Sequence, residues 1–480
     1  MGALSLNSYQ LFQSLPYTLI LRDAFKDKNL YNLIDSKLSK IQSLDSQISL
    51  NCSSLRYKKL TKYSTNTVFP ASVFHLDNGL TFIHQEIPTT PVVVADVWVR
   101  AGATLEPEPW FGMAHFLEHM IFKGTDTLPP GEFDYNIEKM GGVSNAATSH
   151  DYAHYSLTTA TPYLAETLPH LGELLLNAAI PKDEFIRERD VVLEEIRACA
   201  DDPDWIGYES LQKNVYRNHP YGRSVLGTEE ELMQQSPEAM RCFHRSHYQP
   251  ENMTVVVVGG IGQESAWELV NSSFADFSDR SDCPVSDKIP APVIRGICRR
   301  ELTLPRLEQA RLMMAWIAPG VEQLRDGHGL DFLSVLLAQG RTSRLVHDLR
   351  EEKQLVQAIC SNFSLQRESS LLTITAWLEP EYLERVESLI QEHLQNLQTI
   401  GITEQELNRT SRSLCNEYAF AMETPNQLTS LYGYYHTIAQ AELAVAYPQE
   451  IQSFDAQELQ KLAQKYLSPQ NYAVTILKPY

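Results

Sequence analysis

Five residues, His115-Phe-Leu-Glu118-His119, constrain the fold of this chain more than any other feature. The segment 111–122 contains no proline and is rich in apolar residues, which predicts a largely buried helix. Residues four apart share one helix face, so the two imidazoles can reach one metal ion. Polar side chains on a buried helix need partners, so His115, Glu118 and His119 do not form a face exposed to solvent.

The order H-x-x-E-H is the inverse of the zinc-peptidase signature H-E-x-x-H, and its glutamate can accept a proton from an attacking water. The alternative is an ordinary amphipathic helix that carries two histidines, because short motifs also occur by chance. Zinc needs a third protein ligand. Segment 187–196 is helical by composition, and its Glu188 and Glu195 share one face, whereas Glu194 points elsewhere. We expect the third ligand to come from this segment.

Three motifs at matching spacing resemble those of the pitrilysin/insulinase family of zinc metallopeptidases. They are closest to the subfamily that contains the mitochondrial processing peptidase subunits and their bacterial relatives. The motifs are Gly112 to Thr125, Gly141 to Thr148 and Glu188 to Glu195, and the resemblance covers residues 70–480. It implies a zinc metalloendopeptidase that cleaves peptides or small unfolded polypeptides bound as an added β-strand.

The resemblance also implies roles for single residues. One zinc ion per chain would be bound by His115, His119 and Glu195. Glu118 would be the catalytic base, and Glu188 would be an acid that supports the site. Asn145 and Ala146 would lie on an edge strand that pairs with the substrate backbone.

One position departs from the family pattern. Members use an Arg and a Tyr, seven residues apart, to hold the substrate carbonyl, and the matching residues here are Arg350 and Gln357. In one hypothesis Gln357 substitutes in part, and the chain works alone or as a homodimer. In the other, which we favour, the chain is the zinc subunit of a heterodimer, and a homologous partner supplies the Arg–Tyr pair. Arg350 is then structural.

Two further functions stay open as alternatives. Relatives of this fold also serve as non-catalytic scaffold or core subunits of larger complexes. A scaffold has no need of a desolvated carboxylate beside two histidines, which argues against that function. A peptide-maturation protease of a biosynthetic pathway is the other alternative.

The two halves of the chain look related. Residues 250–255 (Pro-Glu-Asn-Met-Thr-Val) and 469–474 (Pro-Gln-Asn-Tyr-Ala-Val) both follow a helical segment and open an apolar strand. A similar offset places the metal motif on Asp331-Phe-Leu-Ser-Val335, where the metal-binding groups are lost. Together with the resemblance, this predicts an α+β fold of two homologous domains, each a mostly antiparallel sheet with helices packed on one face.

Composition suggests the domain boundaries. We expect an N-terminal extension at 1–66, a zinc-bearing catalytic domain at 67–278, a linker with three prolines at 279–294, and a C-terminal domain without zinc at 295–480. Residues 1–64 carry nine Lys/Arg, four Asp and no Glu, which resembles a transit peptide in composition, and 30–48 has a helical pattern.

Charge and cysteine content limit the partners and the compartment. The net charge of −20 argues against nucleic acid, and −25 on residues 65–480 favours basic peptides, although it also serves plain solubility. No apolar run is long enough for a transmembrane span. Seven scattered cysteines fit a reducing compartment. We expect the cytoplasm, or an organelle lumen or stroma if residues 1–64 are a transit segment.

Overall fold

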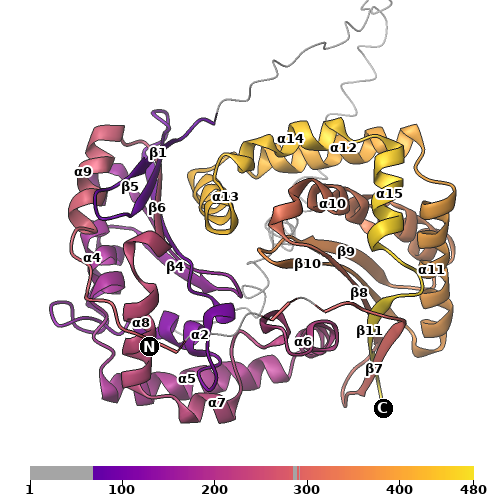
Figure 1. The fold of residues 1–480 in the computed structure, drawn as a ribbon, viewed down its shortest axis with the longest axis horizontal. Helices are drawn as coiled ribbons and strands as arrows, with labels where there is room; N and C mark the ends of the chain where they lie inside the picture. Colours follow the sequence, from indigo (N-terminus) through magenta and orange to yellow (C-terminus); the bar gives the residue numbers. More distant parts are fainter. Residues whose placement is uncertain (1–68, 285–288, 291) are drawn as a thin grey trace, which may run out of the picture.

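The computed structural model describes residues 69–284, 289–290 and 292–480. The expected N-terminal extension, its helical stretch at 30–48 and part of the linker therefore lie outside the described residues. The described chain forms two α+β halves that lie side by side (Figure 1). This confirms the predicted fold class.

The first half is built on a six-stranded sheet with the order β1-β2-β6-β3-β5-β4. The strands are β1 (Ser72–His75), β2 (Thr81–Glu86), β3 (Val92–Val99), β4 (Val143–Thr148), β5 (Ala153–Ala160) and β6 (Met253–Gly259). Only β2 and β6 pair in parallel, and the other neighbours are antiparallel. Strand β6 is buried along its whole length, as its continuous run of valines requires. Strand β4 is an edge strand.

The second half repeats this topology in a five-stranded sheet with the order β7-β11-β8-β10-β9. The strands are β7 (Ile297–Thr303), β8 (Ala310–Pro319), β9 (Ala358–Ser364), β10 (Ser369–Leu378) and β11 (Tyr472–Lys478). Again only the first pair, β7 and β11, is parallel. Strands β6 and β11, which begin within the two related sequence segments, occupy the same place in their sheets.

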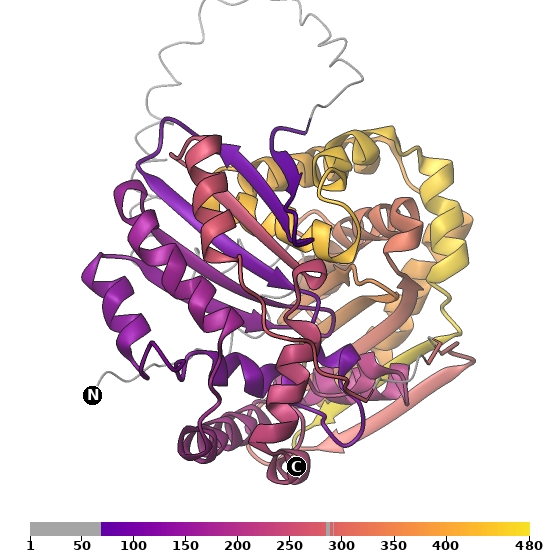
Figure 2. The ribbon, with the colours of Figure 1, turned by 60° about the vertical axis from the view of Figure 1, so that its left-hand side comes forward.

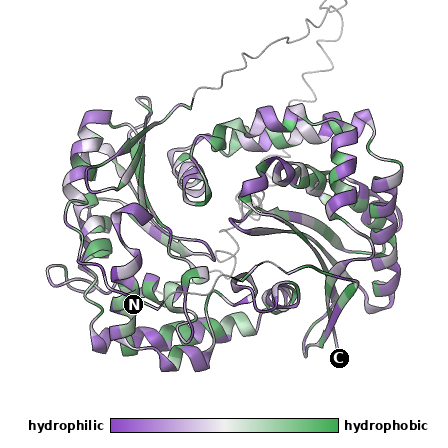
Figure 3. Cartoon of the chain, viewed as in Figure 1, coloured by the Kyte–Doolittle hydropathy of each residue, from purple (hydrophilic) through white to green (hydrophobic). Residues whose placement is uncertain are grey.

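Each sheet carries its own helices on one face. In the first half these are α2 (Met113–Ile121), α3 (Glu132–Lys139), α4 (Leu164–Leu176), α5 (Lys182–Ala200), α7 (Glu229–Gln234), α8 (Pro237–His247) and α9 (Gln263–Ser273). In the second half they are α10 (Leu324–Ala338), α11 (Leu383–Thr399), α12 (Glu404–Phe420), α14 (Leu443–Ser453) and α15 (Ala456–Tyr466). Figure 2 shows helices of the first half lying over its sheet. The strands are rich in hydrophobic residues, whereas the outer helices carry hydrophobic and hydrophilic residues (Figure 3).

The opposite face of each sheet is covered by a helix from the other half, which sequence patterns did not predict. Helix α13 (Pro425–Ile438) packs on β3 and β6 of the first sheet. Helix α6 (Pro203–Tyr216) packs on β8 and β11 of the second sheet. The prediction of helices on one face is therefore correct only within each half. This exchange of helices joins the halves through apolar contacts on both sides.

A glycine allows each exchanged helix to approach its sheet closely. A Cβ atom at Gly433 of α13 would lie 2.0 Å from Nε1 of Trp98, and one at Gly207 of α6 would lie 2.6 Å from Sδ of Met313. The Trp98 indole is rigid and buried, whereas the thioether of Met313 can adjust.

We expect Gly433→Ala to lower the free energy of unfolding by about 1–3 kcal/mol, because overpacking forces a shift of the indole or of α13. Gly207→Ala is the matched control and should cost less, because Met313 can change rotamer. Denaturant midpoints of the two variants measure the difference. Equal midpoints would contradict a tight contact between Gly433 and Trp98.

Candidate metal centre and cleft

Two helices bring together three side chains that could hold a metal ion, called here the metal-binding group. Helix α2 carries His115 and His119, and α5 carries Glu195. Oε2 of Glu195 lies 3.6 Å from Nε2 of His115 and 3.5 Å from Nε2 of His119. The ligand atoms all lie within 4.8 Å of one another, and this is the one such group of three or more among the described residues.

The donor set fits a zinc ion. Two imidazoles and one carboxylate are typical catalytic zinc ligands and leave one coordination position open. Oε2 of Glu195 is buried without a hydrogen-bond partner, although it lies near both Nε2 atoms. A divalent cation among the three atoms would satisfy this orphaned oxygen.

The charges around the group are strongly coupled. Burial would lower the pKa of His119, but its hydrogen bond with Glu188 and the nearby carboxylates of Glu195 and Glu118 outweigh burial and raise that pKa to about 10. Burial lowers the pKa of His115 despite the charge of Glu195. Burial would raise the pKa of Glu195, but the two histidines bring it below its usual value. The site therefore holds a carboxylate close to two nitrogen ligands.

Glu188 contacts the metal-binding group through the side chain of His119. Its Oε1 lies 3.0 Å from Nδ1 of His119, and its Oε2 accepts a bond of 2.6 Å from Nζ of Lys123. Burial opposes the charge of Glu188, but these two partners lower the pKa of its carboxyl. A carboxylate on Nδ1 fixes the tautomer that leaves Nε2 free for a metal.

Glu118 connects the metal helix to the edge of the first sheet. Its Oε2 accepts a hydrogen bond of 2.6 Å from Oγ1 of Thr148, the last residue of β4. Asn145 is exposed and Ala146 half-buried on the same strand, and they pair with Ser156 and Tyr155 of β5. A chain added beside β4 would therefore run past Glu118.

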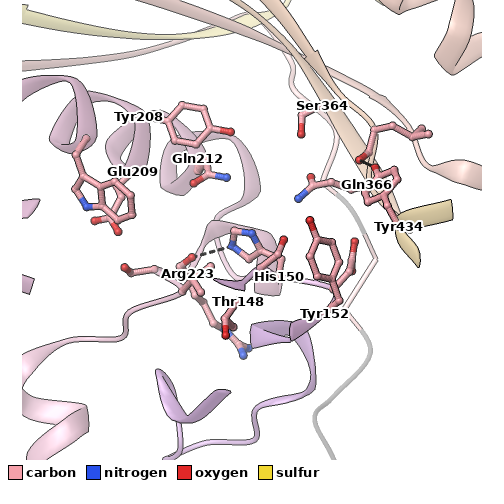
Figure 4. Close-up of a pocket in the computed structure, with 16 residues that line it drawn as sticks. Thr148, His150, Tyr152, Tyr208, Glu209, Gln212, Arg223, Ser364, Gln366 and Tyr434 are labelled. Atoms are coloured by element: carbon pink, nitrogen blue, oxygen red, sulfur yellow. Dashed lines mark hydrogen bonds between the residues drawn. The ribbon is translucent and has the colours of Figure 1, made fainter. Parts of the chain in front are cut away.

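A pocket lies between the two halves next to this strand (Figure 4). Thr148, at the end of β4, and His150 and Tyr152, in the turn between β4 and β5, line it from the first half, and α6 contributes several aromatic and polar side chains. The lining residues from α6 and from the second half include Trp205, Tyr208, Glu209, Gln212, Ser364, Leu365, Gln366 and Tyr434. Burial raises the pKa of Glu209, although Ser224 and Lys213 oppose the rise. His150 is buried, and its Nε2 lies 3.1 Å from the main-chain oxygen of Arg223.

Arg350 is not part of the metal-binding group. It lies in the second half, in a short π-helix (Val346–Glu352), and its guanidinium donates to Glu351 at 2.9 Å. The side chain of Gln357 is exposed, and its main-chain N–H donates to the oxygen of Trp377 at 2.8 Å. Substrate binding by Arg350 stays a prediction.

Three residues that hold the site or the start of its helix in place were missed from the sequence. Lys123 follows His119 by four positions, which is a usable signal. Thr148 lies two positions after Ala146 in β4, so the two side chains point to the same face of the strand. Glu106 precedes the metal helix in an irregular segment, and no pattern marked it.

The chain belongs to the pitrilysin/insulinase family of peptidases. The model of the insulinase family (peptidase family M16) matches residues 81–229, and the model described as "Peptidase M16 inactive domain" matches residues 235–414. An uncharacterized zinc protease, YmxG of Bacillus subtilis, is 30% identical over 358 residues, which are 74% of this chain and 85% of that protein.

Two further relatives from Helicobacter pylori support the same family. The zinc protease PqqE is 28% identical over 411 residues, which are 84% of this chain and 92% of that protein. The crystal structure of a protease from that organism has a TM-score of 0.81 and 26% identity, and the match covers 85% of this chain and 99% of the other. The pitrilysin/insulinase family predicted from the three motifs is thereby confirmed.

Proposed function

We propose that this protein is a zinc metalloendopeptidase that cleaves peptides bound as an added strand beside β4. One observation carries the proposal: Glu118 lies on the metal helix α2 and is hydrogen-bonded to the last residue of an edge strand. A base, a metal-binding group and an open strand edge therefore meet at one place. The names of the relatives, zinc proteases, support the same chemistry.

The zinc ion would be held by His115, His119 and Glu195. It would act as a Lewis acid on the scissile carbonyl and lower the pKa of bound water. Glu118 accepts a proton from the attacking water and returns it to the leaving amine. Thr148 holds the carboxylate in place through its 2.6 Å hydrogen bond. Glu188 and Lys123 orient His119.

The substrate backbone would be satisfied by hydrogen bonds with β4, at Asn145 and Ala146. Backbone pairing accepts varied substrate side chains, so the pocket beside Thr148 would determine which side chains the substrate may carry. Its aromatic residues suit a large side chain, and Glu209 suits a basic one. We propose basic or aromatic residues next to the cleaved bond.

Glu188→Gln should reduce kcat by about 10- to 100-fold with a smaller change in KM, because an outer carboxylate orients a ligand without touching substrate. Steady-state kinetics of the zinc-loaded variant measure this. Glu184→Gln on the same helix is a matched control, since Glu184 pairs with the exposed Arg187. Unchanged kinetics in Glu188→Gln would make Glu188 an ordinary helix acid.

We further propose that the chain is the zinc subunit of a heterodimer whose homologous partner supplies an Arg–Tyr pair. Support comes from Gln357 at the family's tyrosine position and from Arg350, whose guanidinium donates to Glu351. A homodimer, or a chain that acts alone, is the alternative. The experiment is hydrolysis of a mixed library of quenched oligopeptides by the purified, zinc-loaded chain. Silence from this chain supports the heterodimer, whereas robust cleavage contradicts it.

The compartment is a separate proposal. Five cysteines in the described part of the chain carry free thiols, namely Cys199, Cys242, Cys283, Cys298 and Cys415. Free thiols fit a reducing compartment, so we propose the cytoplasm. No helix of the described residues is both long and apolar enough to cross a membrane.

A further inference from the structure

The metal helix α2 begins on a buried carboxylate that belongs to a different segment. Oε2 of Glu106 accepts the main-chain N–H of Gly112 at 2.9 Å, and Oε1 accepts that of Ala114 at 2.8 Å. Glu106 is completely buried and follows a short 3-10 helix (Ala103–Leu105). Gly112, the N-cap residue, contributes no side chain of its own. The first turn of α2 therefore takes its cap from Glu106.

This cap lies directly beside the first metal-binding residue. His115 follows Ala114, so the two bonds of Glu106 fix the turn from which His115 projects. In its ionised form the Glu106 carboxyl also interacts favourably with the helix dipole. Burial raises the pKa of the Glu106 carboxyl to about 8, whereas its two N–H donors and Arg223 oppose that rise. Both oxygens accept a hydrogen bond in this geometry.

A second segment locks the same helix end. The guanidinium carbon of Arg223 lies 4.0 Å from the centre of the Phe111 ring, and its Nη1 donates to the main-chain oxygen of Glu106 at 3.4 Å. A Cβ atom at Gly112 would lie 2.6 Å from the main-chain oxygen of Leu226. The start of α2 therefore has no room to shift towards the segment that contains Arg223.

We propose that Glu106 is a positioning residue that holds the N-terminal turn of α2, and with it His115, in the geometry that binds zinc before the metal arrives. The inference rests on the proposed zinc site and goes beyond it. Glu106 does not touch the metal-binding group, and it acts through the backbone of Gly112 and Ala114. When the site is preformed, the free energy of metal binding is not reduced by the cost of ordering the helix end.

The test is Glu106→Gln, because an amide offers one acceptor oxygen to two N–H donors. We expect the dissociation constant for zinc, from chelator competition, to rise about 10- to 100-fold, as for other outer partners of metal ligands. The visible spectrum of the Co²⁺-loaded variant should also change. Glu406→Gln is the matched control, since Glu406 accepts the main-chain N–H of Thr403 at 2.9 Å to cap α12, far from the metal motif in sequence.

A purely structural cap would lower the melting temperature but leave the dissociation constant and the Co²⁺ spectrum unchanged, which would overturn the inference. Should Glu106→Gln fail to fold, hydrogen exchange in the zinc-free native protein decides. The amides of Gly112 and Ala114 should already be protected there, and rapid exchange at both would overturn the inference. A wild-type chain that binds no zinc would overturn the proposed function as well, whereas equal affinity in wild type and Glu106→Gln overturns this inference alone.

Discussion

Glu118→Gln should lower peptide hydrolysis by about 10²–10⁴-fold, the range that a general base contributes, and should leave zinc content unchanged. The glutamine amide fills the same volume and its oxygen can still accept the hydrogen bond from Thr148, so the local structure should persist. An amide cannot accept the proton of an attacking water at neutral pH. The measurements are kcat/KM on an oligopeptide and zinc content by mass spectrometry.

Glu132→Gln is a suitable control for this variant. Glu132 lies on the neighbouring helix α3, and its side chain is exposed. It should keep wild-type activity. Wild-type activity in Glu118→Gln would show that another group accepts the proton, and loss of zinc would show that Glu118 belongs to the metal-binding group.

Glu195→Gln should lose both zinc and activity. The variant keeps two histidines but replaces the charged third ligand with a neutral amide, which is a poor zinc ligand. We expect the dissociation constant to rise by more than about 100-fold, because even partners outside the ligand shell are worth 10- to 100-fold. Chelator competition measures the constant, and excess zinc should restore part of the activity.

The adjacent residue provides a close control for the third ligand. Glu194 is 72% exposed and pairs with Arg197, so Glu194→Gln should bind zinc like the wild type. If the two variants lost zinc equally, the loss would come from a general disturbance of helix α5 and not from a missing ligand. Full zinc binding by Glu195→Gln would exclude Glu195 as a ligand.

Periodicity predicted the helices and strands that carry the site. Segment 187–196, which is helical by composition, lies within α5, and the apolar strands expected to open at 250–255 and at 469–474 are β6 and β11. The helix around the metal motif is shorter than the expected 111–122, because Gly112 adopts a positive φ of 83° and Phe122 closes the last turn. Local patterns predict such elements because helix and strand periods depend on near neighbours.

The residues that support the metal-binding group could not be predicted in the same way. Thr148 meets Glu118 only after β4 has paired with β5, and Glu106 meets α2 only after an irregular segment folds back. The exchange of α6 and α13 between the halves is also invisible to local patterns, because it depends on the faces that two folded sheets leave uncovered.

The sequence by itself determined the candidate ligand types, their spacing along two helices and the repeat of one topology, because these properties follow from short-range periodicity and from side-chain chemistry. The tertiary structure decided that α5 crosses α2 where Glu195 faces both histidines. It also decided that the open edge of β4 ends at Glu118. The physical reason is that long-range packing of apolar faces sets the distance between groups that are far apart in the chain.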